Sequence, residues 1–258
     1  MKNIISLLTL GLFLFITSCS KEEDAIDHPT AINIKANKQP TGNSANDLLS
    51  DKKFKSIVIE LVYVEGFEPG SAAINNFVSF LTARAHKPNG IRVIKRSIAS
   101  PGNSGYSNEK IASIEDANRT QYNSQDEIAV WAFFADGKSS SDTGTSVILG
   151  TAYRNTSFVI FEQTIQGLSN SPSQTNRSKL ETTVITHEFG HVLGLTNLGT
   201  PLQSNHEDAE HQKHCSEKTC LMYWSSETGS GISNMLTGGA PPQLDAQCIA
   251  DLRANGGK

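Results

Sequence analysis

The residues best suited to do chemistry lie together in the stretch Thr186–Leu195, which contains the pattern His-Glu-x-x-His. On a helix, positions four residues apart share one face, so His187 and His191 can offer two imidazole nitrogens to one metal ion. Neutral imidazole suits zinc, which accepts nitrogen ligands in a tetrahedral site. Glu188 lies beside such a metal rather than on it, where it can take a proton from a water that the metal has made acidic.

The sequence around this pattern predicts the helix that must carry it. Ser178 and Glu181 form a Ser-x-x-Glu capping box at its expected start. Gly194 marks its expected end, because glycine adopts the left-handed conformation of a C-cap at little cost. Apolar residues recur at helical spacing and would form the buried face: Leu180, Val184, Ile185, Phe189, Val192 and Leu193. The alternative is a chance match on a surface helix, and the apolar face argues against it.

The beginning of the chain predicts export and lipid attachment. Lys2 gives a positive start, and the apolar run at residues 4–16 is too short to span a bilayer, so residues 1–18 are predicted to be a signal peptide. Cys19 closes a segment that resembles a bacterial lipobox, which implies a lipoprotein anchored in the membrane; the alternative is a plain secretory signal with an incidental cysteine. The acidic residues 20–24 resemble a sorting motif of surface-exposed lipoproteins in Bacteroidetes-type bacteria, so we expect an outer-membrane location in the cell envelope.

The rest of the chain divides into a tether and one domain. Residues 19–52 are polar and cannot bury enough apolar surface to fold alone, so we expect a flexible tether. Residues 53–258 have the length of a single domain, which we expect to be monomeric. The net charge is −4 and no basic cluster is present, which argues against nucleic-acid binding.

Within residues 53–258, strand and helix patterns alternate. The expected strands are 55–64, 90–98, 127–135, 146–153 and 157–162, and the expected helices before the motif helix are 71–85 and 108–119. Strands that alternate with helices indicate a largely parallel sheet. The short turn at residues 154–156 permits only an antiparallel pair, because a parallel crossover needs a longer connection.

This order of elements resembles that of the metzincin clan of zinc peptidases over roughly residues 55–224, and departs from it in one extra helix between the second and third strands. The resemblance implies an α/β (α+β) zincin fold, in which a mixed, mostly parallel twisted sheet with an antiparallel edge strand packs on the active-site helix. It also implies that residues 53–258 are a zinc metallopeptidase catalytic domain with one catalytic zinc ion and Glu188 as the general base.

The third metal ligand departs from the clan pattern His-Glu-x-x-His-x-x-Gly-x-x-His, because Asn197 stands at its last position. His214 is followed at once by Cys-x₄-Cys-x-Met, which resembles the archaemetzincin branch after a long insertion. The resemblance implies that His214 joins His187 and His191 on the zinc, and that Met222 forms the turn beneath it. Alternatives for a third ligand or a second cation site, or simply a solvated loop, are His206, Glu207, Asp208 and His211.

The cysteines near His214 allow more than one reading. Archaemetzincins carry a later Cys-x-x-Cys that helps to hold a second zinc, but only Cys248 stands there, so this second site is not expected. Cys215 and Cys220 are close together in an exported chain, which permits a disulfide between them; two free thiols or an extra metal site are the alternatives. Cys248 falls in a helical pattern at residues 243–253 and is predicted to be a buried thiol.

Two classes of function fit these features. The first is a zinc-dependent endopeptidase of the cell envelope, whose peptide or protein substrate would add as a strand to the edge at residues 146–153. The second is a non-catalytic surface-binding lipoprotein on a zincin scaffold. Glu188 argues for the enzyme, because a purely structural zinc site has no use for a carboxylate at that position. Nothing in the sequence indicates the cleavage specificity or a mechanism of latency.

Overall fold

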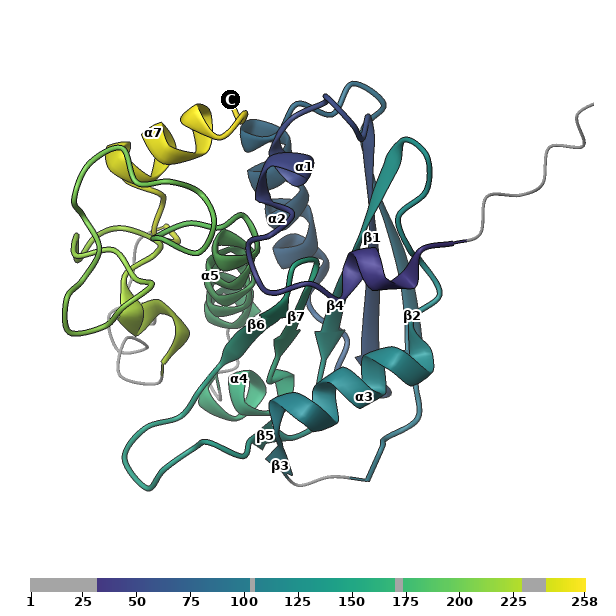
Figure 1. Ribbon diagram of the computed structural model, residues 1–258. Helices are drawn as coiled ribbons and strands as arrows, with labels where there is room; N and C mark the ends of the chain where they lie inside the picture. Colours follow the sequence, from purple (N-terminus) through teal and green to yellow (C-terminus); the bar gives the residue numbers. More distant parts are fainter. Residues whose placement is uncertain (1–31, 103–104, 170–173, 229–239) are drawn as a thin grey trace, which may run out of the picture. The chain divides into compact units, whose positions relative to one another are not determined.

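A five-stranded sheet forms the centre of the protein (Figure 1). Its strand order is β2 (Ile91–Ile98), β1 (Ser56–Val64), β4 (Glu127–Phe134), β7 (Ser157–Ile160) and β6 (Gly150–Arg154). All neighbouring strands are parallel except β6, which runs antiparallel to β7 at the edge. The computed structural model describes residues 32–102, 105–169, 174–228 and 240–258. The predicted α/β fold, with a mostly parallel sheet and one antiparallel edge strand, is confirmed.

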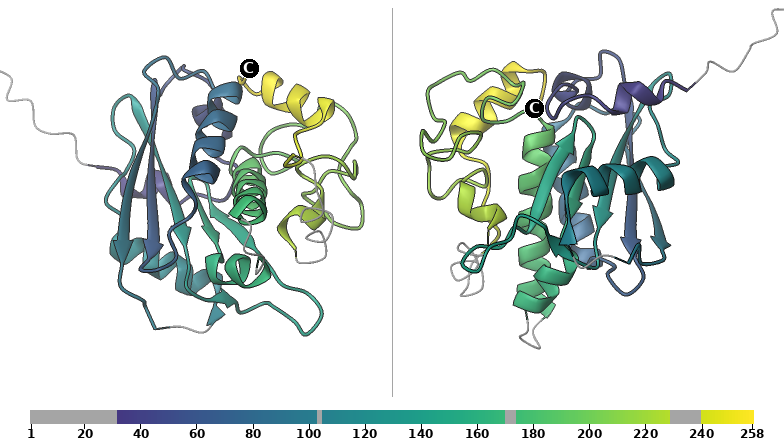
Figure 2. Two further views of the ribbon diagram at one scale, coloured as in Figure 1. Left: turned by 180° about the vertical axis from the view of Figure 1, so that it is seen from behind. Right: turned by 60° about the horizontal axis from the view of Figure 1, so that its bottom comes forward.

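Helices cover both faces of this sheet (Figure 2). On one face lie α2 (Ser71–Arg84) and α5 (Gln174–Val192), and on the other lies α3 (Asn108–Asn118), the extra helix expected between the second and third strands. Side chains alternate between the two faces along each strand. In β1, Ile59 therefore belongs to the core beneath α2 and α5, and Val62 to the core beneath α3. The first core holds α5 against the sheet and so fixes the helix that carries the histidines.

The start of α5 differs from the prediction. The helix begins at Gln174, so Ser178 lies inside it and does not cap it. The carboxylate of Glu181 instead accepts hydrogen bonds from the backbone N–H of Gly70, at 3.0 Å, and from the Arg177 side chain, at 2.8 Å. Glu181 is completely buried, so this pairing ties α5 firmly to the start of α2.

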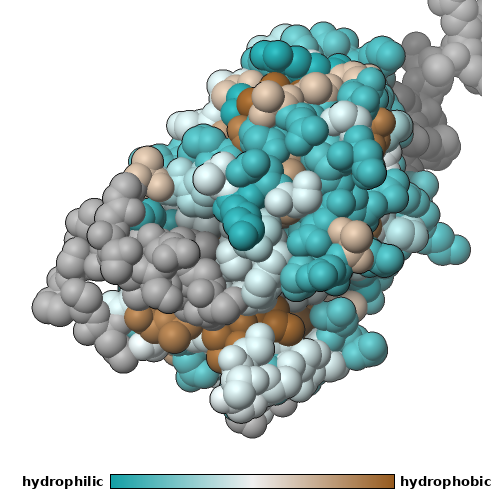
Figure 3. All heavy atoms as spheres, turned by 90° about the vertical axis from the view of Figure 1, so that its left-hand side faces the viewer, coloured by the Kyte–Doolittle hydropathy of each residue, from teal (hydrophilic) through white to brown (hydrophobic). Residues whose placement is uncertain are grey.

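The chain reverses direction directly after α5. Gly194 takes a φ of 74°, which a residue with a Cβ adopts only with strain, as predicted for the end of this helix. A Cβ there would also lie 2.7 Å from the backbone nitrogen of Thr200. An irregular stretch then leads to η2 (Trp224–Glu227), and α7 (Ala246–Ala254) follows near the C-terminus. On this side of the molecule the described surface is mostly hydrophilic, with a hydrophobic strip in the lower part of the view (Figure 3).

The folded unit begins earlier than predicted. The tether expected over residues 19–52 extends at most to residue 31, because the compact unit starts at Ile32. The short elements η1 (Ile34–Asn37) and α1 (Ala45–Leu49) pack onto the domain, and the apolar end of α1 is buried in its core. The ammonium group of Lys87 holds α1 in place by donating to three backbone carbonyls at and after it. These elements were not predicted because the segment is polar, and its one short apolar face covers too few residues to show a periodicity.

Other predicted features at the N-terminus, namely the signal peptide at residues 1–18 and the lipidation site Cys19, lie outside the described residues. Among the residues that the structure describes, no helix is long and apolar enough to cross a membrane. The described residues form three further small elements: β3 (Gly105–Tyr106) pairs with β5 (Lys138–Ser139), and α4 (Glu162–Leu168) follows β7.

Candidate metal centre

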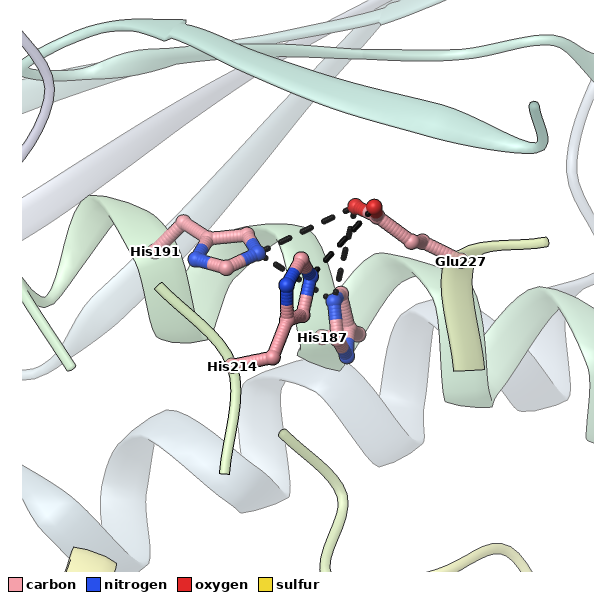
Figure 4. Close-up of side chains that lie close together, drawn as sticks. All are labelled: His187, His191, His214 and Glu227. Carbon is pink, nitrogen blue, oxygen red and sulfur yellow. Dashed lines mark hydrogen bonds and ion pairs between the residues drawn. The ribbon is translucent and has the colours of Figure 1, made fainter. Parts of the chain in front are cut away.

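Three histidine rings converge beside α5 (Figure 4). His187 and His191 lie one turn apart on the helix, and their Nε2 atoms are 3.2 Å apart. His214 comes from the irregular stretch, and its ring centroid lies 5.4 Å from that of His187 and 5.1 Å from that of His191. One donor atom from each ring and one from Glu227 all lie within 4.8 Å of one another, so this group can hold a metal ion.

The surroundings of the rings suit a metal. Nδ1 of His187 lies 2.7 Å from the carbonyl oxygen of Leu221 and can donate to it, which leaves Nε2 as an acceptor. Metal-binding histidines commonly direct their second nitrogen to a carbonyl in this way. Nε2 of His214 is buried and faces the Glu227 carboxylate at 3.3 Å. Burial, followed by the nearby His187, holds the pKa of His191 well below its usual value, so its ring is neutral and can donate a lone pair. These residues therefore fit zinc.

Two strained turns bring His214 to this point. Thr196 and Lys213 have positive φ values of 53° and 69°, and the hydroxyl of Thr196 donates to the carbonyl of Lys213. Glu207 accepts from the side chain of Asn197 at 3.1 Å and from the backbone N–H of Lys213 at 2.8 Å. Asn197, which stands at the third-ligand position of the metzincin pattern, thus helps to hold the two ends of the insertion together. These contacts place His214 beside the two histidines of the helix.

Met222 packs against the helix between its two histidines. A Cβ on Gly190 would lie 2.3 Å from Sδ of Met222, so only a glycine leaves room for this side chain. Met222 is fully buried, and its carbonyl accepts from the backbone N–H of Cys215 at 2.8 Å. The turn containing Met222 therefore supports both the helix that carries His187 and the segment that carries His214.

Glu188 is buried beside the rings with neither carboxylate oxygen hydrogen-bonded. Gly150, the first residue of β6, makes room for it, since a Cβ there would lie 2.6 Å from Cγ of Glu188. Burial, and then the charge of Glu227, raise the pKa of Glu188 well above its usual value. A pocket of about 200 Å³ opens here, lined by Thr41, Thr151, Ala152, Glu188, His191, Leu198, Lys213, His214 and Glu227. A carboxyl group with a raised pKa at a pocket wall is well placed to exchange protons.

Glu227 is the site residue that the sequence analysis missed. Its carboxylate oxygens lie 3.3 Å from Nε2 of His214, 3.6 Å from that of His187 and 3.8 Å from that of His191. Burial alone would raise the pKa of Glu227, but the imidazoles of His187 and His214 beside its carboxylate hold that pKa below its usual value. Glu227 stands in a polar stretch beyond Met222, and no spacing pattern distinguishes it from the other acidic residues of the chain.

A second group of donor side chains lies where no metal site was expected. Its donor atoms lie within 4.8 Å of one another and belong to His206, Cys215, Asp245 and Cys248. Nδ1 of His206 is 3.5 Å from Sγ of Cys215, and its Nε2 is 2.7 Å from a carboxylate oxygen of Asp251. Cys220 adjoins the group, with its Sγ 3.7 Å from that of Cys248. All these sulfur atoms belong to buried residues.

The cysteines of this group are free thiols in the structure, which does not contain the disulfide considered between Cys215 and Cys220. Sγ of Cys215 points to a carboxylate oxygen of Asp245 at 3.3 Å, and Cys220 faces Cys248. Hydrogen bonds from Cys215 and Cys248 lower the pKa of Cys220. Cys248 is completely buried, as predicted.

The remaining donors of the insertion stay away from the three rings. His211 stacks on Trp224, with ring centroids 4.3 Å apart, and its Nδ1 lies 2.9 Å from a carboxylate oxygen of Asp208. Glu207 is engaged with Asn197, as described above. Of the alternatives weighed for the third ligand, His214 is thus the one that lies with His187 and His191.

Comparisons with known proteins bear on the fold. No family model and no curated protein matches the chain. Its structure is similar to that of archaemetzincin from Methanopyrus kandleri, with a TM-score of 0.51 and 17% sequence identity over 78% of this chain and 96% of that chain. A match to metalloproteinase-II from Bacteroides fragilis has a TM-score of 0.42 and 14% identity, over 86% of this chain and 58% of that one. The fold of this protein is therefore archaemetzincin-like.

Proposed function

We propose that this protein is a zinc-dependent endopeptidase in which His187, His191 and His214 bind the metal and Glu188 is the general base. The observation that carries the proposal is the convergence of three imidazoles beside a pocket that His191, His214 and the buried carboxylate of Glu188 line. The donor group lies beside a pocket of about 200 Å³ that can admit a substrate. The archaemetzincin-like fold supports the same conclusion.

The residues of the site have different roles in the proposed reaction. Zinc bound by the imidazoles would supply a Lewis acid and lower the pKa of a coordinated water to about 7. Glu188 takes a proton from the attacking water and passes it to the leaving amine, which its raised pKa suits. The edge strand β6 lies beside the pocket through Thr151 and Ala152, so an extended peptide can pair with it as an added strand.

The location and the alternative function rest on the sequence. We propose that lipid on Cys19 anchors the protein in the outer membrane of the cell envelope, with a tether of residues 20–31 before the folded unit, and that the protein acts as a monomer on peptide or protein substrates.

A non-catalytic surface-binding protein on the same scaffold remains the second function. The buried Glu188 favours the enzyme, because burying a carboxylate without a partner is costly and persists where it serves a purpose.

We also propose that the second donor group holds a structural zinc ion, in addition to the one catalytic ion. The group whose donor atoms all lie within 4.8 Å of one another consists of His206, Cys215, Asp245 and Cys248. With the adjoining Cys220 in place of Asp245 the donors would be Cys₃His, a set that is common in structural zinc sites. With bonds of about 2.3 Å to sulfur and 2.0–2.1 Å to nitrogen, tetrahedral donors are about 3.6–3.8 Å apart. The sulfur–sulfur distance of 3.7 Å and the nitrogen–sulfur distance of 3.5 Å agree with this spacing. Asp251 orients His206 as a carboxylate partner does in other zinc sites.

The proposed activity is tested with Glu188→Gln, which keeps the shape of the side chain and removes the base. The purified protein is analysed for zinc and incubated with a peptide library. We expect unchanged zinc content and a fall in hydrolysis by about 10²–10⁴-fold. Glu210→Gln, at an exposed position in the insertion, is the matched control and should retain full activity. Hydrolysis by Glu188→Gln at the parent rate would disprove the assignment of the base, and zinc-loaded parent protein without any hydrolysis would favour the binding protein.

A further inference from the structure

Glu227 faces the point on which the three rings converge (Figure 4). Donor atoms of a tetrahedral zinc site with bonds of about 2.0–2.1 Å lie about 3.4 Å apart. Nε2 of His187 and Nε2 of His191 are 3.2 Å apart, which is close to this size. Oε1 of Glu227 lies 3.3 Å from Nε2 of His214, and its Oε2 lies 3.6 and 3.8 Å from Nε2 of His187 and His191. The four donors therefore lie close enough together, all within 4.8 Å of one another, to share one metal ion. Glu188, with its carboxylate packed against Gly150, is not a member of the group.

The backbone holds Glu227 in this position. The carbonyl of Glu227 accepts from the N–H of Leu149 at 2.9 Å, and Thr228 forms an antiparallel bridge with Ile148. Residues 148 and 149 lead directly into β6, the edge strand to which a peptide substrate would add. The chain around Glu227 thus pairs with the start of the substrate-binding edge, while its side chain reaches the metal position from the pocket side.

We infer that Glu227 is a fourth protein ligand that closes the zinc site and keeps the enzyme latent. The inference rests on the proposed peptidase function. Catalytic zinc sites keep one position open for water or substrate, and sites with four protein ligands are closed. Activity then requires the segment that carries Glu227 to leave both the metal and the edge at residues 148–149. The side chain of Glu227 is 25% exposed, so it can move into solvent without disrupting the core.

The inference is tested by measuring the open position on the metal directly. Glu227→Gln and Glu227→Ala are compared with the parent protein and with Glu210→Gln, which removes one charge from an exposed position nearby. Zinc affinity is measured by competition with a chromophoric chelator, and acetohydroxamic acid, a small zinc-binding molecule, is titrated into the zinc-loaded proteins. Peptide hydrolysis is recorded in parallel.

Loss of the fourth ligand should weaken zinc binding by about tenfold or more. If the parent site is closed nine-tenths of the time, acetohydroxamic acid should bind about tenfold more tightly to both Glu227 variants, and hydrolysis should rise by a similar factor. Glu210→Gln should change none of these values. Unchanged zinc and acetohydroxamic acid affinities in both Glu227 variants would overturn the inference. So would stronger acetohydroxamic acid binding with reduced hydrolysis, because Glu227 would then serve the reaction. The expected binding changes without hydrolysis by any protein would support the closed site and refute the peptidase function.

Discussion

Gly190→Ala is expected to destabilise the metal-free protein, although alanine is the better helix former. In an exposed helix interior this change stabilises by about 1 kcal/mol. At position 190 the new Cβ would lie 2.3 Å from Sδ of Met222 and 3.1 Å from its Cε, and Met222 is fully buried. Overpacking of this kind costs about 1–3 kcal/mol. The clash should therefore outweigh the helix propensity and leave a net loss of about 1 kcal/mol.

A double-mutant cycle identifies the cause. Met222→Ala alone should cost about 2–5 kcal/mol, because it leaves a cavity in the core. In that background Gly190→Ala meets no clash, so it should stabilise by about 1 kcal/mol, which gives a coupling of about 1–3 kcal/mol between the two positions. Gly167→Ala is the matched control, because Gly167 lies in α4 and a Cβ there would meet nothing within 4 Å. It should stabilise both the parent and Met222→Ala.

The assay is urea unfolding in the presence of a metal chelator, because bound zinc would add its own binding energy to the free energy of unfolding. Equal slopes of the unfolding free energy against urea would show that the variants unfold from comparable states. If Gly190→Ala stabilises the parent protein as much as Gly167→Ala does, Met222 does not pack between the histidines and this part of the site is incorrectly described.

Three further predictions address the N-terminal segment, the anchor and the second metal. Burial lowers the pKa of Lys87 to about 8, whereas an unfolded lysine titrates near 10.5. The folded state therefore loses this proton first, and stability should rise between about pH 8 and 10.5. Chemical denaturation of Lys87→Met should lack that rise, and equal pH profiles would contradict the lowered pKa. Cys19→Ala should move the protein from the membrane fraction to the soluble fraction, and unchanged detergent-dependent fractionation would exclude lipidation. The parent should contain two zinc ions per chain and His206→Ala one, as measured by elemental analysis; one zinc in both would exclude the second site.

Much of the fold could be predicted because its signals are local. The strands of the sheet and the helices that cover it show their periodicity within windows of ten to fifteen residues. The antiparallel edge followed from the length of the turn at residues 154–156 alone. The pair His187 and His191 was visible because helical geometry converts a spacing of four residues into proximity. His214 could be predicted as a ligand only from the adjoining Cys-x₄-Cys-x-Met, because the length of an insertion does not indicate where in space the chain returns.

The features that were missed depend on contacts between distant parts of the chain. Glu227 reaches the rings because its backbone pairs with residues 148 and 149, far away in sequence. His206 reaches Cys248 because α7 packs beside the insertion, and its partner Asp251 lies inside that helix. The pattern Cys-x-x-Cys could not reveal this group, because one of its donors is His206, which comes from the insertion, and not a second cysteine beside Cys248.

The two donor groups share one short segment of chain, residues 214–222. His214 belongs to the first group and its neighbour Cys215 to the second. At the other end, Cys220 joins the second group while the carbonyl of Leu221 accepts from His187. The segment has no helix or strand of its own, so the contacts at its two ends must hold it. A metal bound by Cys215 and Cys220 would fix both ends and thereby position His214. Loss of that metal should therefore weaken zinc binding at the first group, although the two share no ligand.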